Sequence, residues 1–237
     1  MALNTSHTPD GRGGVLIYNG EVIMVYTRGV VVQFEKTGEQ TMKGKKHGAI
    51  YLTSHRIIFI SSDGNDRLHS FCMPFHCMRD VKLEQPILGA NYLHGIVMAQ
   101  PGGNWEGDAV FKITFNKGGC IDFGQALLRA VAMAEAFHHY AAPPPYTPPA
   151  GGFFCAPPAY YMPTGNNSYG FQAPTHAFPD APPANDVYMY ESPPPYAGIG
   201  PTPAPFPAGQ AQAAAGGSSG VTPSAPPTYD EVTKKTN

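Results

Sequence analysis

The sequence predicts an α+β domain over residues 1–140, in which a bent antiparallel sheet or partial barrel is closed by one C-terminal helix, and a disordered Pro-rich tail over residues 141–237. Short apolar runs separated by turn residues predict the strands. A change to helical apolar spacing after residue 124 predicts the helix. Of the 26 prolines, 22 follow Tyr140, which places the boundary between domain and tail there.

Five extended runs are expected in the first half of the domain, at residues 15–18, 21–26, 30–34, 48–53 and 56–61. Asn19-Gly20 separates the first two runs and is a strong short hairpin signal, because both residue types tolerate positive φ. Gly29 separates the second run from the third, and Ser54-His55 turns between the last two. We therefore expect runs that neighbour each other in the sequence to pair antiparallel.

The second half of the domain is expected to finish the sheet and then form the helix. Further strands are expected at residues 68–75, 81–84, 91–99 and 109–115, with a return strand at 120–123 after a hairpin loop at 116–119. Residues 125–137 are rich in strong helix formers, and Leu127, Ala130, Val131 and Ala134 share one face. This order is typical of the pleckstrin-homology arrangement, although the pattern alone does not select it over other small barrels.

The tail is too poor in aliphatic groups to form a core of its own. It contains only four Ile, Leu or Val residues, namely Val187, Ile199, Val221 and Val232. Such a segment cannot bury enough apolar surface to offset the entropy that ordering the chain costs. We therefore expect residues 141–237 to be disordered, with local polyproline character.

Composition argues against several classes of function. The domain carries 13 Lys and Arg against 12 Asp and Glu, so we expect no direct binding of nucleic acid. No apolar run is long enough to span a membrane, and the first residues do not resemble a signal peptide. The sequence contains no recognisable catalytic motif, so we expect neither an enzyme nor a cofactor. The expected location is the cytoplasm and the nucleus.

The four cysteines are expected to be reduced and structural. Cys72, Cys77, Cys120 and Cys155 lack the spacing of a zinc site and contain no Cys-x-x-Cys pair. Small apolar residues in or near strands are the simpler interpretation. We therefore expect no metal site.

Four Pro-Pro-x-Tyr motifs lie in the last hundred residues. The Pro-Pro pairs and tyrosines are Pro143, Pro144 and Tyr146; Pro157, Pro158 and Tyr160; Pro193, Pro194 and Tyr196; and Pro226, Pro227 and Tyr229. Proline fixes φ near −65° and restricts the residue before it, so such peptides favour the polyproline helix that the aromatic grooves of WW domains recognise. We expect these twelve residues to bind WW domains; a chance product of a proline-rich spacer is the alternative.

The motif spacing predicts how the motifs are used. Tyr196 and Tyr229 are 33 residues apart, roughly 30 Å for a flexible chain, which suits a partner with two WW domains. Tyr146 and Tyr160 are only 14 residues apart and should act as alternatives. Phosphorylation of a motif tyrosine would add about −2 charge to a group that enters a neutral pocket, so it should weaken binding.

A basic loop gives a rival interpretation. Lys43, Lys45, Lys46 and His47, with Arg56 nearby, could hold a phosphoinositide headgroup at a membrane surface. The alternative is a solvated strand edge, where lysines oppose sheet aggregation.

Particular segments carry a resemblance to known families. Residues 45–60 resemble the core of the GRAM domain, a branch of the pleckstrin-homology superfold, with Gly48, Leu52-Thr53 and Arg56 before Ile57-Ile-Phe59. Segments 1–4, 70–75, 85–95, 103–107 and 122–125 are similar to the WW-domain-binding protein 2 family, which includes the sperm postacrosomal sheath form. The resemblance covers about residues 1–135, whereas the tail matches only in kind.

This resemblance implies an adaptor that binds the WW domains of Yes-associated-protein-type co-activators and of ubiquitin ligases. It also implies a role as a transcriptional co-activator, with steroid hormone receptors as further partners. The alternatives are a membrane-surface GRAM module that recruits WW-type ubiquitin ligases and a sperm-type factor in egg activation.

Overall fold

The computed structural model describes residues 1–9, 13–138, 152–163 and 170–200 of the 237-residue chain. The strands are β1 (Ala2–Leu3), β2 (Val15–Ile17), β3 (Ile23–Glu35), β4 (Lys45–Thr53), β5 (Arg56–Ser61), β6 (Ser70–Pro74), β7 (Met78–Glu84), β8 (Tyr92–Met98), β9 (Asp108–Phe115), β10 (Phe153–Cys155) and β11 (Val187–Tyr190). The helix α1 spans Cys120–His138, and short 3-10 helices span Gln40–Met42, Phe75–Cys77, Pro158–Tyr160 and Ala184–Asp186.

Eight strands form a bent sheet in the order β1-β6-β5-β4-β3-β9-β8-β7, and every pair in it is antiparallel. The hairpin through Ser54-His55 is confirmed, because β4 pairs with β5. Gly29 does not separate two strands, as the sequence suggested. It has φ +77° and forms a bulge within β3, which lets one long strand bend between β4 and β9.

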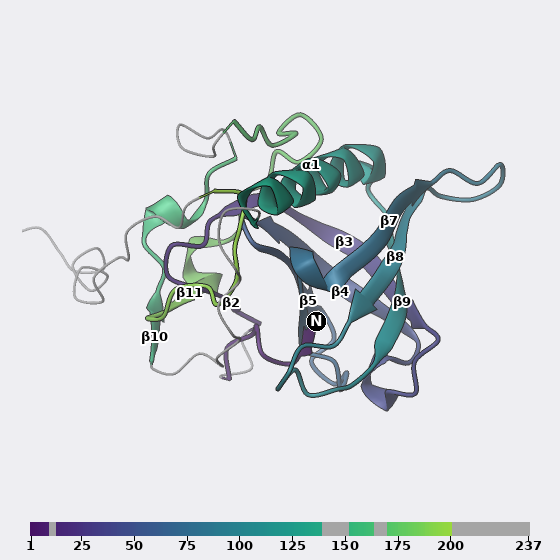
Figure 1. Ribbon diagram of the computed structural model, residues 1–237, viewed down its shortest axis with the longest axis horizontal. Coiled ribbons are helices and arrows are strands. Elements are labelled where there is room, and N and C mark those ends of the chain that lie inside the picture. Colours follow the sequence, from purple (N-terminus) through teal and green to yellow (C-terminus); the bar gives the residue numbers. More distant parts are fainter. Residues whose placement is uncertain (10–12, 139–151, 164–169, 201–237) are drawn as a thin grey trace, which may run out of the picture.

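Helix α1 lies along one end of the bent sheet and completes the predicted α+β, pleckstrin-homology-like arrangement (Figure 1). The return strand expected at residues 120–123 is wrong, since α1 already begins at Cys120. The Phe123 N–H donates to the Gly119 carbonyl at 2.9 Å, so the turn after β9 leads directly into the helix. No helix within the described residues is long and apolar enough to cross a membrane.

The side chains of α1 and one face of the sheet form what we call the inner cluster. Its largest buried members include Phe59, Phe71, Phe111, Phe123 and Leu127. Phe59 and Phe71 stack with ring centroids 5.0 Å apart. The predicted apolar face of the helix is confirmed, because Leu127, Ala130 and Ala134 are buried in this cluster and Val131 packs against it.

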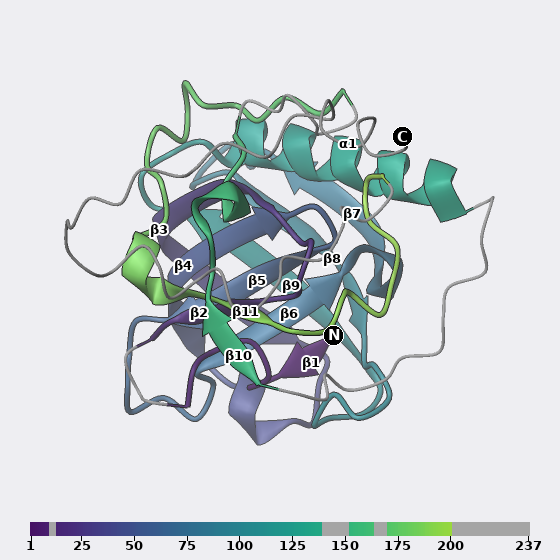
Figure 2. The ribbon, with the colours of Figure 1, turned by 90° about the vertical axis from the view of Figure 1, so that its left-hand side faces the viewer.

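A second sheet of three strands, in the order β10-β11-β2, forms a separate layer in front of β4, β5 and β6 (Figure 2). The turn at Asn19-Gly20 does form, since the Glu21 N–H donates to the Tyr18 carbonyl at 3.0 Å. However, β2 does not pair with β3 as the hairpin signal suggested. It pairs in parallel with β11, about 170 residues further along the chain.

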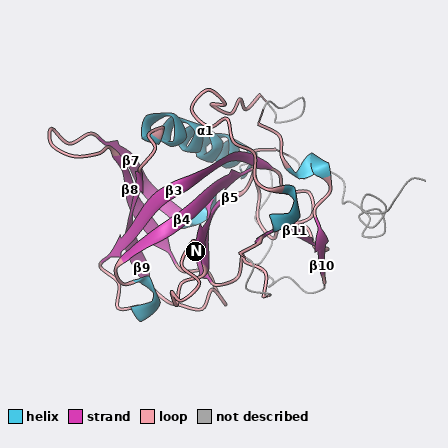
Figure 3. Cartoon of the chain, turned by 180° about the vertical axis from the view of Figure 1, so that it is seen from behind, coloured by secondary structure: helices cyan, strands magenta, loops and turns pink. Residues whose placement is uncertain are grey.

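Between the two sheets lies the outer cluster, whose buried members are Val15, Ile17, Ile23, Tyr26, Tyr51, Ile58, Ile60, Tyr160, Val187 and Met189, with Ala2, Cys72 and Ala156. Seen from behind, β10 and β11 stand beside β3, β4 and β5 (Figure 3). The second sheet therefore shields a face of the main sheet that α1 does not reach.

Residues 152–163 and 170–200 differ from the expected disordered tail, because they pack on the domain. Phe171 and Phe178 join the inner cluster, and Val187 and Met189 join the outer one. The physical reason is that their apolar groups are buried against the domain. The composition of the tail shows only that it cannot form a core of its own. The boundary at residue 140 remains a prediction, and the rest of 141–237 lies outside the described residues.

Candidate functional site

The candidate site forms where residues 191–199, which contain the third Pro-Pro-x-Tyr motif, cross the β4–β5 turn. We call this the third-motif segment. The surface beneath it begins with a buried ion pair between β5 and the turn that precedes β3. Arg56 donates from Nε and Nη2 to the two carboxylate oxygens of Glu21, each at 2.9 Å. Both side chains are almost wholly buried, at 2% and 0% exposure.

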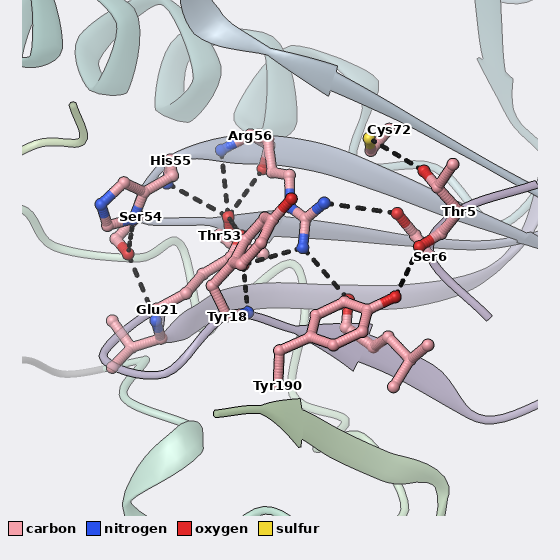
Figure 4. A network of polar contacts seen from close by, with 12 residues as sticks. Thr5, Ser6, Tyr18, Glu21, Thr53, Ser54, His55, Arg56, Cys72 and Tyr190 are labelled. Carbon is pink, nitrogen blue, oxygen red and sulfur yellow. Dashed lines mark hydrogen bonds and ion pairs between the residues drawn. The ribbon is translucent and has the colours of Figure 1, made fainter. Parts of the chain in front are cut away.

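The remaining groups of this ion pair are also satisfied. Arg56 donates further to the Leu16 carbonyl at 3.1 Å and to Ser6 Oγ at 3.3 Å, and its guanidinium lies 4.5 Å from the centre of the Tyr18 ring. Burial alone would raise the pKa of Glu21, but the Arg56 charge holds that pKa below its ordinary value. The pair therefore stays charged and fixes β2 and the following turn to β5 (Figure 4).

The β4–β5 turn presents His55 beside this pair. Thr53 Oγ1 accepts from the backbone N–H groups of His55 and Arg56 at 3.1 and 3.0 Å, and Ser54 Oγ lies 2.7 Å from His55 Nδ1. Burial lowers the pKa of His55 to about 4, with Glu21 acting in the opposite direction. The imidazole is thus neutral at physiological pH.

The third-motif segment is bound by backbone hydrogen bonds to this turn and to the turn that follows β2. The Ile199 N–H donates to the Ser54 carbonyl at 2.9 Å, and the Asn19 N–H donates to the Ser192 carbonyl at 3.0 Å. Gly198 lies so close that a Cβ atom there would come within 2.4 Å of the Ser54 carbonyl oxygen. The position accepts glycine because no side chain fits between the two backbones.

Tyr196, the tyrosine of the third motif, is buried in a pocket of aromatic rings. Its side chain is 4% exposed. The ring lies 5.5 Å from His76, 5.9 Å from Tyr18 and 6.3 Å from His55, measured between ring centres. Burial raises the pKa of Tyr196 well above its ordinary value, with Arg56 acting in the opposite direction. The hydroxyl therefore stays protonated.

The second motif is held in a different way, within the outer cluster. Pro157 is the extended N-cap of a 3-10 turn formed by Pro158–Tyr160. Tyr160 is 6% exposed, and its hydroxyl donates to the Pro182 carbonyl at 3.2 Å. The Met162 N–H then donates to the Ile23 carbonyl at 2.9 Å, which ties this segment to the first residue of β3.

The described residues thus include two of the four predicted motifs, the second and the third, and the tyrosine of each is buried. The first and fourth motifs, with Pro143, Pro144, Tyr146, Pro226, Pro227 and Tyr229, lie outside the described residues. The two prolines that begin the third motif differ in exposure, since Pro193 is exposed and Pro194 is half-buried. Sequence reasoning missed the docking; the signal that could have found it is the alternation in Val187-Tyr-Met-Tyr190, where Val187 and Met189 are buried.

The predicted basic surface is smaller than expected. Arg56 belongs to the buried pair with Glu21 and cannot meet a headgroup, which corrects its assignment as a lipid-binding residue. Lys46 is also buried and lies 2.6 Å from the Asp66 carboxylate. Lys43, Lys45 and His47 remain exposed. The exposed cluster therefore lacks the bidentate group that the sequence suggested.

The described residues provide no evident metal site. No group of three or more His, Cys, Asp or Glu side chains within them could hold a metal ion. Cys72, Cys77 and Cys120 are buried and Cys155 is exposed, and all four are free thiols.

Comparison with known proteins gives relatives for part of the chain. The GRAM domain family matches residues 22–133. "WW domain-binding protein 2" of Mus musculus and of Homo sapiens are each 44% identical to this chain over 136 residues, which is 56% of this chain and 51% of theirs. "Postacrosomal sheath WW domain-binding protein" of Bos taurus is 44% identical over 137 residues, or 56% of this chain and 44% of its own. The alignments span about half the length of these curated relatives, and the names describe binding proteins.

Among solved structures, the chain is similar to the "Vps36 N-terminal PH domain". The TM-score is 0.42 and the sequence identity is 22%, over 55% of this chain and 93% of that one.

Proposed function

We propose that this protein is a non-enzymatic adaptor that binds WW-domain proteins through its Pro-Pro-x-Tyr motifs. The observation that carries the proposal is the presence of four such motifs in one chain. It is supported by the 44% identity to proteins that are themselves named for binding WW domains. The GRAM domain at residues 22–133 then serves as the folded body on which the motifs are carried.

Several motifs on one chain can give a high overall affinity although each motif alone binds weakly. One short motif buries little area and should bind in the micromolar range. A second motif on the same chain binds at a high effective concentration and can raise the overall affinity by about 10²- to 10⁴-fold. The increase in affinity is therefore expected to be largest for a partner with two WW domains.

The test uses four synthetic peptides, one for each motif, and the full chain. Each is titrated with a single WW domain and with a tandem pair, and each motif tyrosine is replaced by alanine in turn. We expect each peptide to bind the single domain and each Tyr→Ala change to weaken it at least tenfold, about 1.4 kcal/mol. If none of the four peptides binds, the motifs are a product of composition and the adaptor proposal fails.

The cellular role follows from the partners. A WW adaptor without DNA-binding surface would act as a transcriptional co-activator by recruiting Yes-associated-protein-type proteins, or would bring WW-type ubiquitin ligases to a target. Such an adaptor is expected in both cytoplasm and nucleus. Phosphorylation of the motif tyrosines is expected to weaken WW binding, because it adds charge to a ring that enters a neutral pocket.

A second candidate function is binding to an anionic membrane surface, favoured by the exposure of Lys43, which precedes β4, and of Lys45, its first residue. The test is sedimentation with vesicles that contain a phosphoinositide, comparing the full chain with a Lys43→Glu, Lys45→Glu variant. Membrane binding predicts that the wild-type chain sediments and that the variant does not. Equal sedimentation of both would assign the lysines to the solvated strand edge.

A further inference from the structure

We infer that the folded domain masks the second and third Pro-Pro-x-Tyr motifs, so that the four motifs form two classes with different access to WW domains. The masking surface for the third motif consists of Tyr18, Ser54, His55 and His76, and its occupant is the chain's own third-motif segment. The inference deepens the proposed function and rests on it for the identity of the competing partner.

The first step concerns the tyrosine of the third motif. A WW domain recognises this type of motif through the tyrosine ring as well as the prolines. Tyr196 is 4% exposed, and its ring is enclosed by Tyr18, His55 and His76. One ring cannot occupy two pockets, so the domain and a WW domain compete for it.

The second step concerns the backbone of the second motif. WW domains bind the extended polyproline helix. Here Pro158–Tyr160 form a 3-10 turn, in which the Tyr160 N–H donates to the Pro157 carbonyl at 2.9 Å. This motif must therefore unfold its turn as well as release Tyr160 before a WW domain can bind it.

The third step is that one small sheet holds both motifs. The second motif begins two residues after β10, and the third motif begins three residues after β11. These strands pair with each other, and β11 pairs with β2. Release of β11 from β2 would therefore loosen the attachment of both motifs.

The fourth step shows why the docked state can be displaced. Among the described residues, three buried side-chain atoms lack a hydrogen-bond partner within the protein, namely His55 Nε2, Ser192 Oγ and Tyr196 Oη. All three lie in or directly beneath the third-motif segment. Burying a polar atom without a hydrogen-bond partner costs free energy. The apolar contacts of this segment must therefore offset that cost in the docked state. A partner that satisfies the tyrosine hydroxyl can compete with it.

The experiment isolates the third motif in the full chain. Tyr146→Ala, Pro158→Ala and Tyr229→Ala together leave the third motif as the one complete motif, and the exposed Pro158 is changed so that the buried Tyr160 ring stays in place. This chain is compared with a peptide of residues 190–200 and with the same chain carrying Gly198→Val, which lies outside the Pro-Pro-x-Tyr core and pushes the segment away from Ser54. Gly38→Val is the matched control, since its Cβ would meet nothing within 4 Å.

The measured quantity is the dissociation constant for a single WW domain. We expect the chain with these three substitutions to bind at least tenfold more weakly than the peptide. Gly198→Val should restore binding to within about threefold of the peptide, and Gly38→Val should leave it weak. Equal affinity of chain and peptide overturns the masking while leaving the adaptor function intact. A peptide that does not bind the WW domain contradicts the proposed function itself.

Amide hydrogen exchange tests the docking without a WW domain. The Ile199 and Asn19 amides should be protected in the wild-type chain, because they donate to the Ser54 and Ser192 carbonyls. Gly198→Val should remove the protection of Ile199 while Ile58 in β5 stays protected, which shows that the variant is folded. Exchange of Ile199 in the wild-type chain at the rate of an unstructured peptide would overturn the inference.

Discussion

Strands β5 and β8 belong to the same sheet, but β5 is buried on both faces whereas β8 is buried on one. In β5, Ile57 and Phe59 belong to the inner cluster, and Ile58 and Ile60 belong to the outer cluster. In β8, buried and half-buried residues alternate. A strand that is apolar on both faces needs two covering layers, and here β2 together with segments beyond residue 140 supplies the second one.

The two covering layers also differ in how they are held. Helix α1 follows β9 directly and brings Phe123 and Leu127 to the inner cluster. The outer layer depends on β11, which reaches β2 from a distant part of the chain. The inner layer should therefore survive changes that release the outer one, and four predictions test this difference.

The largest effect is expected at the buried ion pair, which joins the second sheet and its following turn to the main sheet. Glu21→Gln leaves Arg56 with an uncompensated buried charge and should reduce the free energy of unfolding by about 3–5 kcal/mol. Urea denaturation measures this. Asp122→Asn, which alters the exposed contact with His176, is the control and should cost about 0–1 kcal/mol. Similar losses from both variants would show that burial does not determine the strength of these pairs.

The next effect compares the two faces of β5. Ile57→Ala and Ile58→Ala should each lower the free energy of unfolding by about 2–5 kcal/mol, because each opens a cavity in one cluster. Val187→Asp places a charge in the outer cluster and should release the outer layer. In the Val187→Asp variant, Ile58→Ala should lower the free energy of unfolding by less than in the wild-type chain. Ile57→Ala should lower it by the same amount in both. An unchanged cost at Ile58 would mean that the outer layer does not bury it.

A smaller effect is expected from acid. Because the pKa of His55 is lowered to about 4 in the folded protein, the unfolded state binds more protons as the pH falls below about 6.5. The stabilisation by neutral His55 is complete above that pH and is lost progressively down to about pH 4, with roughly 2 kcal/mol lost by pH 5. The groups around the imidazole are Ser54, Glu21, Arg56 and Tyr196.

Thermal unfolding between pH 7 and pH 5 measures this loss. His55→Gln should flatten the dependence over this range. Glu21 contributes a further loss at lower pH, because its pKa is also lowered. A wild-type chain whose stability does not change between pH 7 and pH 5 would show that His55 is not buried as a neutral group.

The smallest effect distinguishes the two docked tyrosines. Tyr160→Phe removes a hydroxyl that donates to Pro182 and should cost about 0.5–1.5 kcal/mol. Tyr196→Phe removes a hydroxyl that has no partner within the protein, so it should be neutral or slightly stabilising. Thermal unfolding of both variants gives the comparison. A larger loss at Tyr196 than at Tyr160 would mean that the Tyr196 hydroxyl is satisfied.

Much of the local structure follows from the sequence. The apolar runs at residues 48–53 and 56–61 correspond to β4 and β5, and the helical spacing at 125–137 corresponds to most of α1. These are properties of neighbouring residues, because side-chain period and turn chemistry act over a few positions. A continuous apolar run such as Ile57-Ile-Phe-Ile60 is typical of a strand buried on both faces, but it does not show what the second covering layer is.

The sequence by itself determined where most strands of the eight-stranded sheet lie along the chain, the closing helix and the positions of the four motifs. Only the tertiary structure decided that β2 pairs with β11, that Arg56 is buried with Glu21, and that Tyr160 and Tyr196 are enclosed. These outcomes depend on contacts between residues far apart in the chain, such as Glu21 and Arg56 at 35 positions and Tyr18 and Tyr196 at 178 positions. Such contacts depend on which surfaces meet after folding, and the apolar groups of a segment can be buried by a distant part of the chain that local composition does not reveal.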